Sequence, residues 1–277
     1  MTTAVGPWTY DWQDRPRPFV HPVRTPAGHT LSVDAPSDHP WHHGLWFTIK
    51  FVNGENFWEE YGEFGTLRQS SAPVVTDLGA DATRADSRLD WVRPDGTTVV
   101  ATETCRLTHR PMTDGWALDW DVRFEPAVEV ELDRTPFTTW GGYGGLTLRG
   151  RPDWHDTRLR LPDGADRDRV LGDRAPWCAL DGLLDDGAAG VVLLDHPENR
   201  GHPVPWYAST RSATYGDEGW SNFVNAAFLW DGPVTLAAAE ALHLRYRVIV
   251  HDDEWDLDRL TRAWTDWTDP IEGNLPP

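Results

Sequence analysis

The sequence predicts an all-β protein: a large antiparallel β-sandwich with a short C-terminal helix. Apolar and polar residues alternate along many segments, as they do in half-buried strands. Turn signals such as Pro94-Asp95-Gly96 and Asp231-Gly232-Pro233 separate these segments. Only one segment has helical spacing. Numerous strands without helices between them exclude a doubly wound parallel sheet.

Two segments carry the clearest strand pattern. Their predicted inward-facing residues are Trp116, Leu118, Trp120, Val122 and Phe124 in the first, and Leu242, Leu244, Tyr246, Val248 and Val250 in the second. Residues 101–109 repeat the pattern with a weaker apolar face. Further strands are expected at residues 29–34, 44–52, 66–76, 87–93, 144–149, 157–161, 189–195, 204–209 and 225–230.

The one expected helix lies near the C-terminus. Its apolar positions are Leu257, Leu260, Trp264 and Trp267, and Asp252 and Asp253 are its candidate N-caps. The Pro-rich segment 15–18 is typical of a sheet edge leading into the first strand. We find no linker, repeat or low-complexity segment, so we expect one domain over residues 1–277.

Composition limits the function classes. At 277 residues the chain can bury a large core, and its formal net charge is −19. Such an acidic protein is repelled by nucleic acid and by anionic membrane surfaces, so neither is an expected partner. The sequence leaves the oligomeric state open, and a homo-oligomer is compatible with it.

Localisation is expected to be cytoplasmic. The N-terminus shows neither the basic nor the apolar region of a signal peptide, and no apolar run approaches the roughly 18 residues of a membrane span. Cys105 and Cys178 are the only cysteines, which favours a reducing compartment and excludes a zinc site built from cysteine alone.

Tryptophan is unusually frequent, with 17 residues against 6 tyrosines and 9 phenylalanines. Most indoles fill protein cores, but their flat faces also stack on sugar rings. Six lie beside polar turn residues: Trp41, Trp46, Trp58, Trp140, Trp206 and Trp220. This composition slightly favours a carbohydrate or aromatic ligand, with core packing as the alternative.

The stretch S-D-H-P-W-H-H-G-L-W-F holds His39, His42 and His43 next to Asp38. Imidazole changes protonation near neutral pH and is a common metal ligand. Neighbouring strand residues point to opposite faces, so His42 and His43 are not expected in one pocket, whereas His39 and His42 could converge across the turn. With no H-E-x-x-H motif and no third ligand nearby, acid–base chemistry is favoured over a metal site.

The stretch N-G-E-N-F-W-E-E places Glu55, Glu59 and Glu60 after a turn signal. A strand of about eight residues would carry this turn roughly 25 Å from the histidines. Pairing these glutamates with the histidines therefore depends on the fold, and solvated loop acids are the alternative.

Residues 193–207 form a polar loop after a buried strand. The loop presents Asp195, His196, Asn199, Arg200, His202, Trp206 and Tyr207 between rigid prolines. This composition is typical of an ordered binding loop, with a plain structural loop as the alternative.

The stretch W-G-G-Y-G-G-L-T-L-R, residues 140–149, is not a phosphate loop, because it lacks G-K-[ST] and a strand follows it. Glycines beside Trp140 and Tyr143 would let the backbone approach a flat ligand. Arg149 is a candidate to bind a carboxylate or a hydroxyl pair, or else to form a surface ion pair.

The four stretches described above, together with H-P-V-R-T-P-A-G-H and L-H-L-R-Y-R-V-I-V-H-D, resemble the bacterial family labelled "methane oxygenase PmoA". The resemblance covers roughly residues 18–252. The label names a membrane oxygenase, and this chain fits such a protein poorly, because it has no apolar run long enough to span a membrane. The resemblance implies a galactose-mutarotase-like supersandwich and, by fold analogy, a carbohydrate ligand.

The family pattern near the histidines is D-H-P-H-H-R-G. Asp38, His39, Pro40, His42 and Gly44 match it, but Trp41 replaces a histidine and His43 replaces an arginine. This departure weakens a three-histidine metal site. In the later loop, the matching positions are Asp195, His196, Asn199, His202 and Trp206.

We therefore expect a carbohydrate-active enzyme that transfers protons on a sugar or keto-glycoside, either an epimerase or mutarotase-like isomerase or a lyase. The expected acid–base residues are His39, His42, His202, Glu55 and Glu59. The expected substrate-binding residues are Trp41, His43, Tyr143, Arg149, Asp195, His196, Asn199 and Trp206.

No cofactor is expected under this hypothesis. The first alternative is a metal-assisted glycoside lyase or hydrolase, in which a divalent metal would be held by His39 and His42. The second alternative is a non-catalytic sugar-binding β-sandwich.

Overall fold

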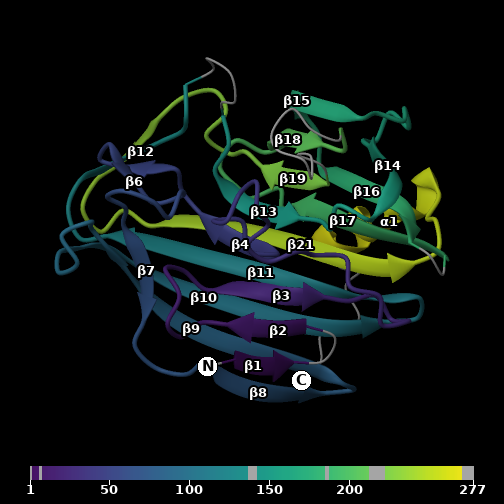
Figure 1. Ribbon diagram of the computed structural model, residues 1–277, viewed down its shortest axis with the longest axis horizontal. Coiled ribbons are helices and arrows are strands. Elements are labelled where there is room, and N and C mark those ends of the chain that lie inside the picture. Colours follow the sequence, from purple (N-terminus) through teal and green to yellow (C-terminus); the bar gives the residue numbers. More distant parts are fainter. Residues whose placement is uncertain (1, 6–7, 137–141, 185–186, 212–221, 270–277) are drawn as a thin grey trace.

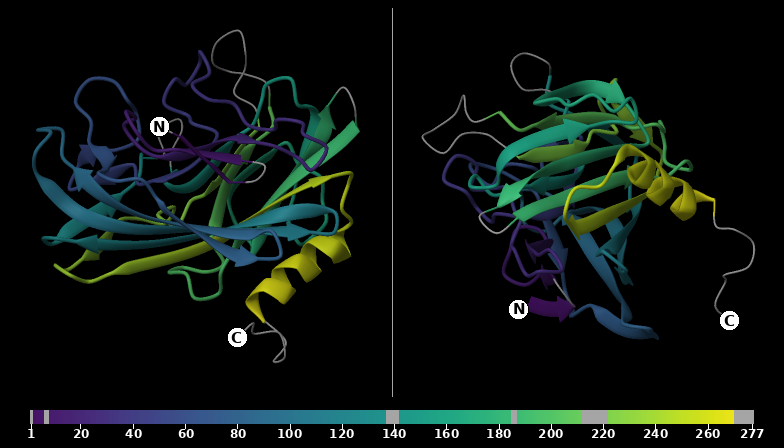
Figure 2. Two further views of the ribbon diagram at one scale, coloured as in Figure 1. Left: turned by 90° about the horizontal axis from the view of Figure 1, so that it is seen from below. Right: turned by 90° about the vertical axis from the view of Figure 1, so that its right-hand side faces the viewer.

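The computed structural model describes residues 2–5, 8–136, 142–184, 187–211 and 222–269, and consists of two large antiparallel sheets packed face to face (Figures 1 and 2). The predicted antiparallel β-sandwich with a short C-terminal helix is confirmed.

The eight-stranded sheet carries the site described below. In spatial order its strands are β1 (Thr2–Val5), β2 (Trp8–Asp11), β3 (Phe19–Val23), β4 (Leu45–Thr48), β13 (Gly145–Arg149), β19 (Phe223–Ala226), β18 (Pro205–Ser209) and β15 (Arg169–Arg174).

The nine-stranded sheet lies behind it. Its strands, in spatial order, are β14 (His155–Arg160), β16 (Trp177–Leu184), β17 (Gly187–Asp195), β21 (Leu242–Asp252), β11 (Gly115–Pro126), β10 (Val99–Met112), β9 (Ala82–Val92) and β7 (Thr66–Gln69), with β8 (Val74–Gly79) also paired to β9. A small third sheet contains β20 (Val234–Leu236), β12 (Val130–Asp133), β5 (Phe51–Val52) and β6 (Glu55–Asn56).

The main core fills the space between the two large sheets. The predicted inward faces of β11 and β21 are confirmed, because all ten of those residues are buried in one hydrophobic cluster. Trp120 of β11 lies opposite Tyr246 of β21 in the register. Side chains of Leu45 and Phe47 on β4 belong to the same cluster, so it joins the two sheets. Each large apolar side chain buried in this way contributes about 1.5–3 kcal/mol.

The outer face of the nine-stranded sheet is covered by α1 (Leu257–Thr268). Ala117 and Ile249, which alternate with the core residues, are buried there with Leu260 of the helix. The N-cap is Asp256, whose side chain accepts a hydrogen bond from the backbone N–H of Arg259. The prediction of Asp252 or Asp253 as the cap is wrong, because β21 continues to Asp252. Across the described residues, no helix combines the length and apolarity needed to cross a bilayer.

Three expected strands are interrupted. The segment 66–76 divides into β7 and β8, which pair with different parts of β9. The segment 44–52 divides into β4 and β5, because the chain leaves the large sheet there and joins the small one. The segment 29–34 forms only isolated bridges, at Thr30, Ser32 and Asp34. The strand β16 was not expected, although its first six residues are buried.

The outer face of the eight-stranded sheet carries a separate group of aromatic residues, termed here the outer aromatic cluster. Its buried aromatic members are Phe19, Trp46, Trp58, Tyr207 and Phe223, and Ala227 packs among them. The sheet therefore has an apolar side facing the core and a second apolar side facing outward. The candidate site lies on the outward side.

Glu103 on β10 provides a test of the core. Its side chain is buried and accepts a hydrogen bond from Trp91 Nε1 at 2.9 Å, and burial raises its pKa to about 8. A carboxyl group with a raised pKa stabilises the fold below the unfolded pKa, and this contribution is lost as the pH rises toward the folded value. We expect Glu103→Gln to unfold like the wild type at pH 5 and to be more stable by at least about 1 kcal/mol at pH 8.

Urea unfolding at both pH values would measure this difference. Glu125→Gln, on the neighbouring strand β11, is the matched control, because Glu125 pairs with Arg123 at the surface. A Glu103→Gln variant that is equally destabilised at both pH values would contradict the expectation.

Candidate functional site

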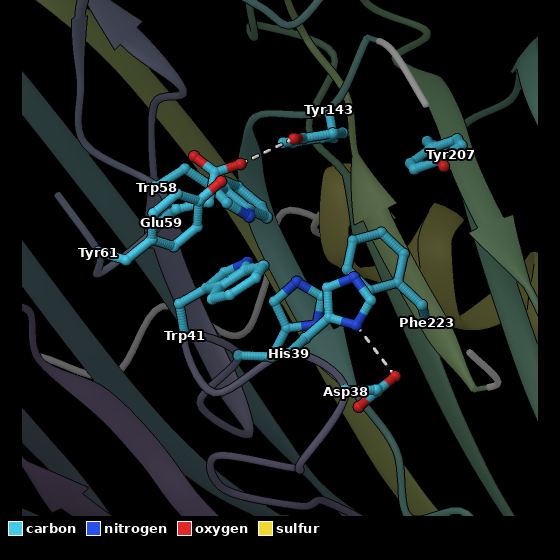
Figure 3. Close-up of a pocket in the computed structure, with 10 residues that line it drawn as sticks. Asp38, His39, Trp41, Trp58, Glu59, Tyr61, Tyr143, Tyr207 and Phe223 are labelled. Carbon is cyan, nitrogen blue, oxygen red and sulfur yellow. Dashed lines mark hydrogen bonds and ion pairs between the residues drawn. The ribbon is translucent and has the colours of Figure 1, made fainter. Parts of the chain in front are cut away.

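A cavity of about 320 Å³ opens on the outer face of the eight-stranded sheet (Figure 3). This volume lies within the range of about 300–1,000 Å³ that small-molecule sites occupy. The cavity is lined by Asp38, His39, Trp41, His42, Trp58, Glu59, Tyr61, Tyr143, Tyr207 and Phe223. Most of the lining is aromatic, and the exceptions are two carboxylates and two imidazoles.

The histidine turn supplies a hydrogen-bonded carboxylate–imidazole pair. His39 Nδ1 lies 2.9 Å from Asp38 Oδ2. Burial alone would raise the pKa of Asp38, but the hydrogen bonds from His39 and Arg149 outweigh it and lower that pKa. Because the ionised carboxylate can only accept, His39 donates its Nδ1 proton and, when neutral, carries its lone pair on Nε2.

His42 differs from His39 in its hydrogen-bond partner. Its ring stacks on that of His39, with centroids 4.6 Å apart, and its Nδ1 lies 3.2 Å from Arg149 Nη1. Burial, and then the Arg149 charge, lower the pKa of His42 well below its ordinary value. A guanidinium can only donate, so Nδ1 is the acceptor and the neutral ring carries its proton on Nε2.

Arg149 joins these two imidazoles to β13. Its side chain is 2 % exposed, and Nη2 donates to Asp38 at 2.8 Å while Nη1 contacts His42. Arg149 was predicted to hold substrate hydroxyls. Its two terminal nitrogens instead contact side chains of the protein itself. Arg149 positions the histidine turn.

Glu59 and Tyr143 form a second acid–base pair in the cavity. The Tyr143 hydroxyl donates to Glu59 Oε1 at 3.1 Å, and Lys50 Nζ forms an ion pair with Glu59 Oε2. Burial and then the Glu59 charge raise the pKa of Tyr143, so its hydroxyl stays protonated. Burial lowers the pKa of Lys50 against the opposing effect of Glu59.

A tight hairpin brings Glu59 to the cavity. The chain turns at Asn53-Gly54, both with positive φ, and β6 returns alongside β5. The N–H of Phe57 then donates to the carbonyl of Lys50, and the Thr48 hydroxyl donates to the carbonyl of Phe57. These hydrogen bonds bring Glu59 back beside Lys50, which follows β4 in the chain. Glu55, at the start of the returning strand β6, instead forms an ion pair with Arg93 and does not line the cavity.

The aromatic walls come from several separate segments. Trp58 packs on Tyr143, with ring centroids 4.9 Å apart, and Trp41 packs on Tyr61 at 5.2 Å. Tyr61 is 63 % exposed and so stands at the mouth of the cavity. These residues leave a flat-walled space with polar groups at two sides, and Figure 3 shows the Glu59–Tyr143 pair at one side and the Asp38–His39 pair at another.

Trp206 does not line the cavity, contrary to the role predicted for it. On β18 alternate side chains face opposite sides, so Trp206 is buried in the main core, where Nε1 donates to the carbonyl of Ala175. Its neighbour Tyr207 faces outward and lines the cavity instead.

His43 also lies outside the cavity lining. Its Nδ1 is 2.6 Å from Asp34 Oδ1, its Nε2 is 2.9 Å from Glu60 Oε1, and its ring stacks on Phe19. The expected divergence of His42 and His43 is therefore seen. His43 ties the histidine turn to the segment that carries Glu59.

The part of segment 193–207 that precedes Tyr207 does not line the cavity. The buried Asp195 carboxylate receives hydrogen bonds from Asn199 Nδ2 and the Val204 N–H, and lies 2.7 Å from His202 Nδ1. The ring of His202 stacks on Trp264 of α1, and that of His196 contacts Trp267. This arrangement fits the structural alternative for the loop, and His202 does not join His39 and His42 in the cavity lining.

Of the residues predicted for the site, the cavity brings together His39, His42, Glu59, Trp41 and Tyr143. It also contains Asp38, Trp58 and Tyr207, which the sequence patterns included without a specific role in the site, and Tyr61 and Phe223, which they did not include. Alternation along β18 could have indicated Tyr207, whereas Phe223 gave no sequence signal. Trp140 and Trp220 lie outside the described residues.

Metal ligands do not gather in the described part of the chain: no three His, Cys, Asp or Glu side chains there are placed to share one ion. The metal alternative relied on His39 and His42. Because His42 Nδ1 accepts from Arg149, the Nε2 of neutral His42 carries the proton and has no lone pair for a metal. The guanidinium next to His42 would also repel a bound cation.

His43 makes stability depend on pH. Burial would lower its pKa, but the hydrogen bonds with Asp34 and Glu60 outweigh burial and raise it. The resulting stabilisation is fully present below the unfolded pKa of about 6.5 and is lost as the pH rises through the higher folded value. We expect His43→Asn to be destabilised most at mildly acidic pH, with a smaller difference from the wild type in alkaline solution.

Thermal and urea unfolding across this pH range would test the expectation. His155→Asn is the control, because His155 is half-exposed and contacts only Asp156 among the carboxylates. A destabilisation of His43→Asn that is constant with pH would show that His43 does not carry the charge.

Comparisons with known proteins identify the family but supply no activity. Among solved structures, the chain is similar to a galactose mutarotase related enzyme from Lactobacillus acidophilus, with a TM-score of 0.46 and 9% sequence identity, over 91% of this chain and 97% of that one. No curated protein matches the sequence. None of these comparisons supports the PmoA label suggested by the sequence motifs.

The model of one protein family matches residues 5–265, which is most of the chain. That family is described as a family of unknown function, DUF6807. The protein therefore belongs to the DUF6807 family.

Proposed function

We propose that the cavity binds a carbohydrate and catalyses proton transfer on it, as an epimerase, a mutarotase-like isomerase or a lyase. One observation carries this proposal: two acid–base pairs, Asp38–His39 and Glu59–Tyr143, line the same aromatic-walled cavity. Flat aromatic walls suit the apolar faces of a sugar ring, and the polar groups suit its hydroxyls.

His39 is the base in this proposal. Its Nε2 lone pair takes a proton from an anomeric hydroxyl, or from a carbon beside a carbonyl, and the ring becomes imidazolium. Asp38 stabilises that cation through the Nδ1 hydrogen bond, at 2.9 Å. The arrangement follows the logic of an imidazole oriented by a carboxylate, which transfers protons well near neutral pH.

His42 is the hydrogen-bond donor to the oxygen on which negative charge develops. A neutral imidazole that keeps its Nε2 proton can donate to such an oxygen without transferring the proton fully. The nearby guanidinium of Arg149 keeps the ring neutral.

Glu59 and Tyr143 return a proton or hold a hydroxyl. Groups at two sides of one ring would allow a proton to leave from one face and to be replaced from the other, which inversion at a carbon requires. A lyase would use the same base, with loss of a leaving group in place of reprotonation.

The catalytic role of His39 can be measured by proton NMR in deuterated water, using free sugars, glycosides and 3-keto-glycosides. We expect protein-dependent loss of a carbon-bound proton signal, anomeric interconversion or product formation. His39→Asn should lower the rate by about 10²- to 10⁴-fold, the usual contribution of a positioned base.

His202→Asn is the matched control, because His202 also pairs with an aspartate but does not line the cavity. It should retain nearly the full rate. Equal losses in both variants would remove the special role of His39, and shifts of sugar signals without turnover would leave a sugar-binding protein.

The state of His42 gives a second test that needs no substrate. Nitrogen-15 NMR of labelled histidine should place the His42 proton on Nε2, with no titration over the interval of about pH 5–8 in which ordinary histidines change charge. In Arg149→Met, the loss of the guanidinium should raise the His42 pKa toward its ordinary value. A normally titrating His42 in the wild type would contradict its assignment as a neutral donor.

A further inference from the structure

The cations nearest the cavity all have partners within the protein. Lys50 Nζ pairs with Glu59 and also lies 3.2 Å from Asn56 Oδ1. Arg149 Nη2 donates to Asp38 at 2.8 Å. Each carboxylate that lines the cavity is thus neutralised by one cation.

Arg17 completes this pattern behind the cavity wall. It is fully buried, its Nη1 donates to the carbonyl of Trp58 at 2.6 Å, and it lies 3.4 Å from Glu60 Oε1. Glu60 also contacts His43. Arg17 therefore holds the backbone of the wall and interacts electrostatically with Glu60.

The lining among the described residues contains no lysine or arginine. The internal segments outside the description, residues 6–7, 137–141, 185–186 and 212–221, contain no Lys or Arg in their sequence, and Asp217 and Glu218 lie in the last of them. They cannot supply a cation. The formal net charge of −19 adds a long-range repulsion for anions.

We infer that the cavity is selective for an uncharged saccharide, such as a neutral sugar or glycoside, and rejects uronic acids and sugar phosphates. This inference rests on the proposed function, whose substrate class it narrows. A carboxylate or phosphate placed in the cavity would lose water without gaining a cation, which is unfavourable for a buried charge. A cationic ligand would gain little, because Asp38 and Glu59 are already paired.

The test compares the binding of matched probes to the full chain. The probes are the methyl glycosides of glucose and galactose, the corresponding uronic acids and the corresponding 6-phosphates. Saturation-transfer NMR and calorimetry at low salt should show binding of a neutral member, with its charged analogues at least about tenfold weaker.

Binding of a charged analogue as tight as that of its neutral parent would overturn the inference and leave the proposed function standing. If no probe of either kind binds, both the proposed function and the inference fail.

A variant tests the electrostatic cause directly. Glu59→Gln removes one carboxylate and leaves the Lys50 ammonium beside the cavity without its ion-pair partner, so uronic acids should gain affinity relative to neutral glycosides. The control is Glu55→Gln, the same substitution in an ion pair with Arg93 that lies outside the cavity lining. It should leave the ratio of affinities unchanged.

Thermal unfolding of both variants shows whether they are folded. Arg149→Met gives a second route at about pH 8, where a histidine of ordinary pKa is neutral. It leaves Asp38 without its guanidinium partner and should weaken the binding of the charged analogues further. An unchanged ratio of affinities in folded Glu59→Gln, or an equal change in Glu55→Gln, would overturn the electrostatic explanation.

Discussion

The candidate site depends on the contacts of the buried Arg149 guanidinium with Asp38 and His42. Taking such a cation out of water is costly unless charged and polar partners replace its hydration. Here the partners are Asp38 and His42, which belong to a turn more than 100 residues earlier in the chain. The last residue of β13 therefore determines where the histidine turn lies.

The same guanidinium gives two stacked histidines different surroundings. It helps keep Asp38 ionised, so His39 has a carboxylate that can stabilise its imidazolium form. It also helps keep His42 neutral, since a second positive charge beside it is unfavourable. Groups of one chemical type, only 4.6 Å apart, thus acquire the distinct properties that a base and a neutral donor require.

The sequence predicted the fold better than the site. Period-two patterns in β11 and β21 identified the core correctly, because a strand buried on one face has apolar residues at every second position. The position of Glu59 in the cavity lining could not be predicted, because it depends on the chain changing sheets after β4 and returning through a hairpin. His202 was misleading for a related reason: its pairing with Asp195 orders a loop, and composition alone does not separate that role from catalysis.

Consecutive residues of strand β18 face opposite sides of the sheet. Trp206 fills the main core, and Tyr207 forms part of the cavity wall. Inserting or deleting one residue within this strand would exchange their faces, placing the indole in the cavity and the phenol in the core. During divergence, length changes should therefore accumulate in the loops that flank β18, while its five residues keep a fixed length even as their side chains change.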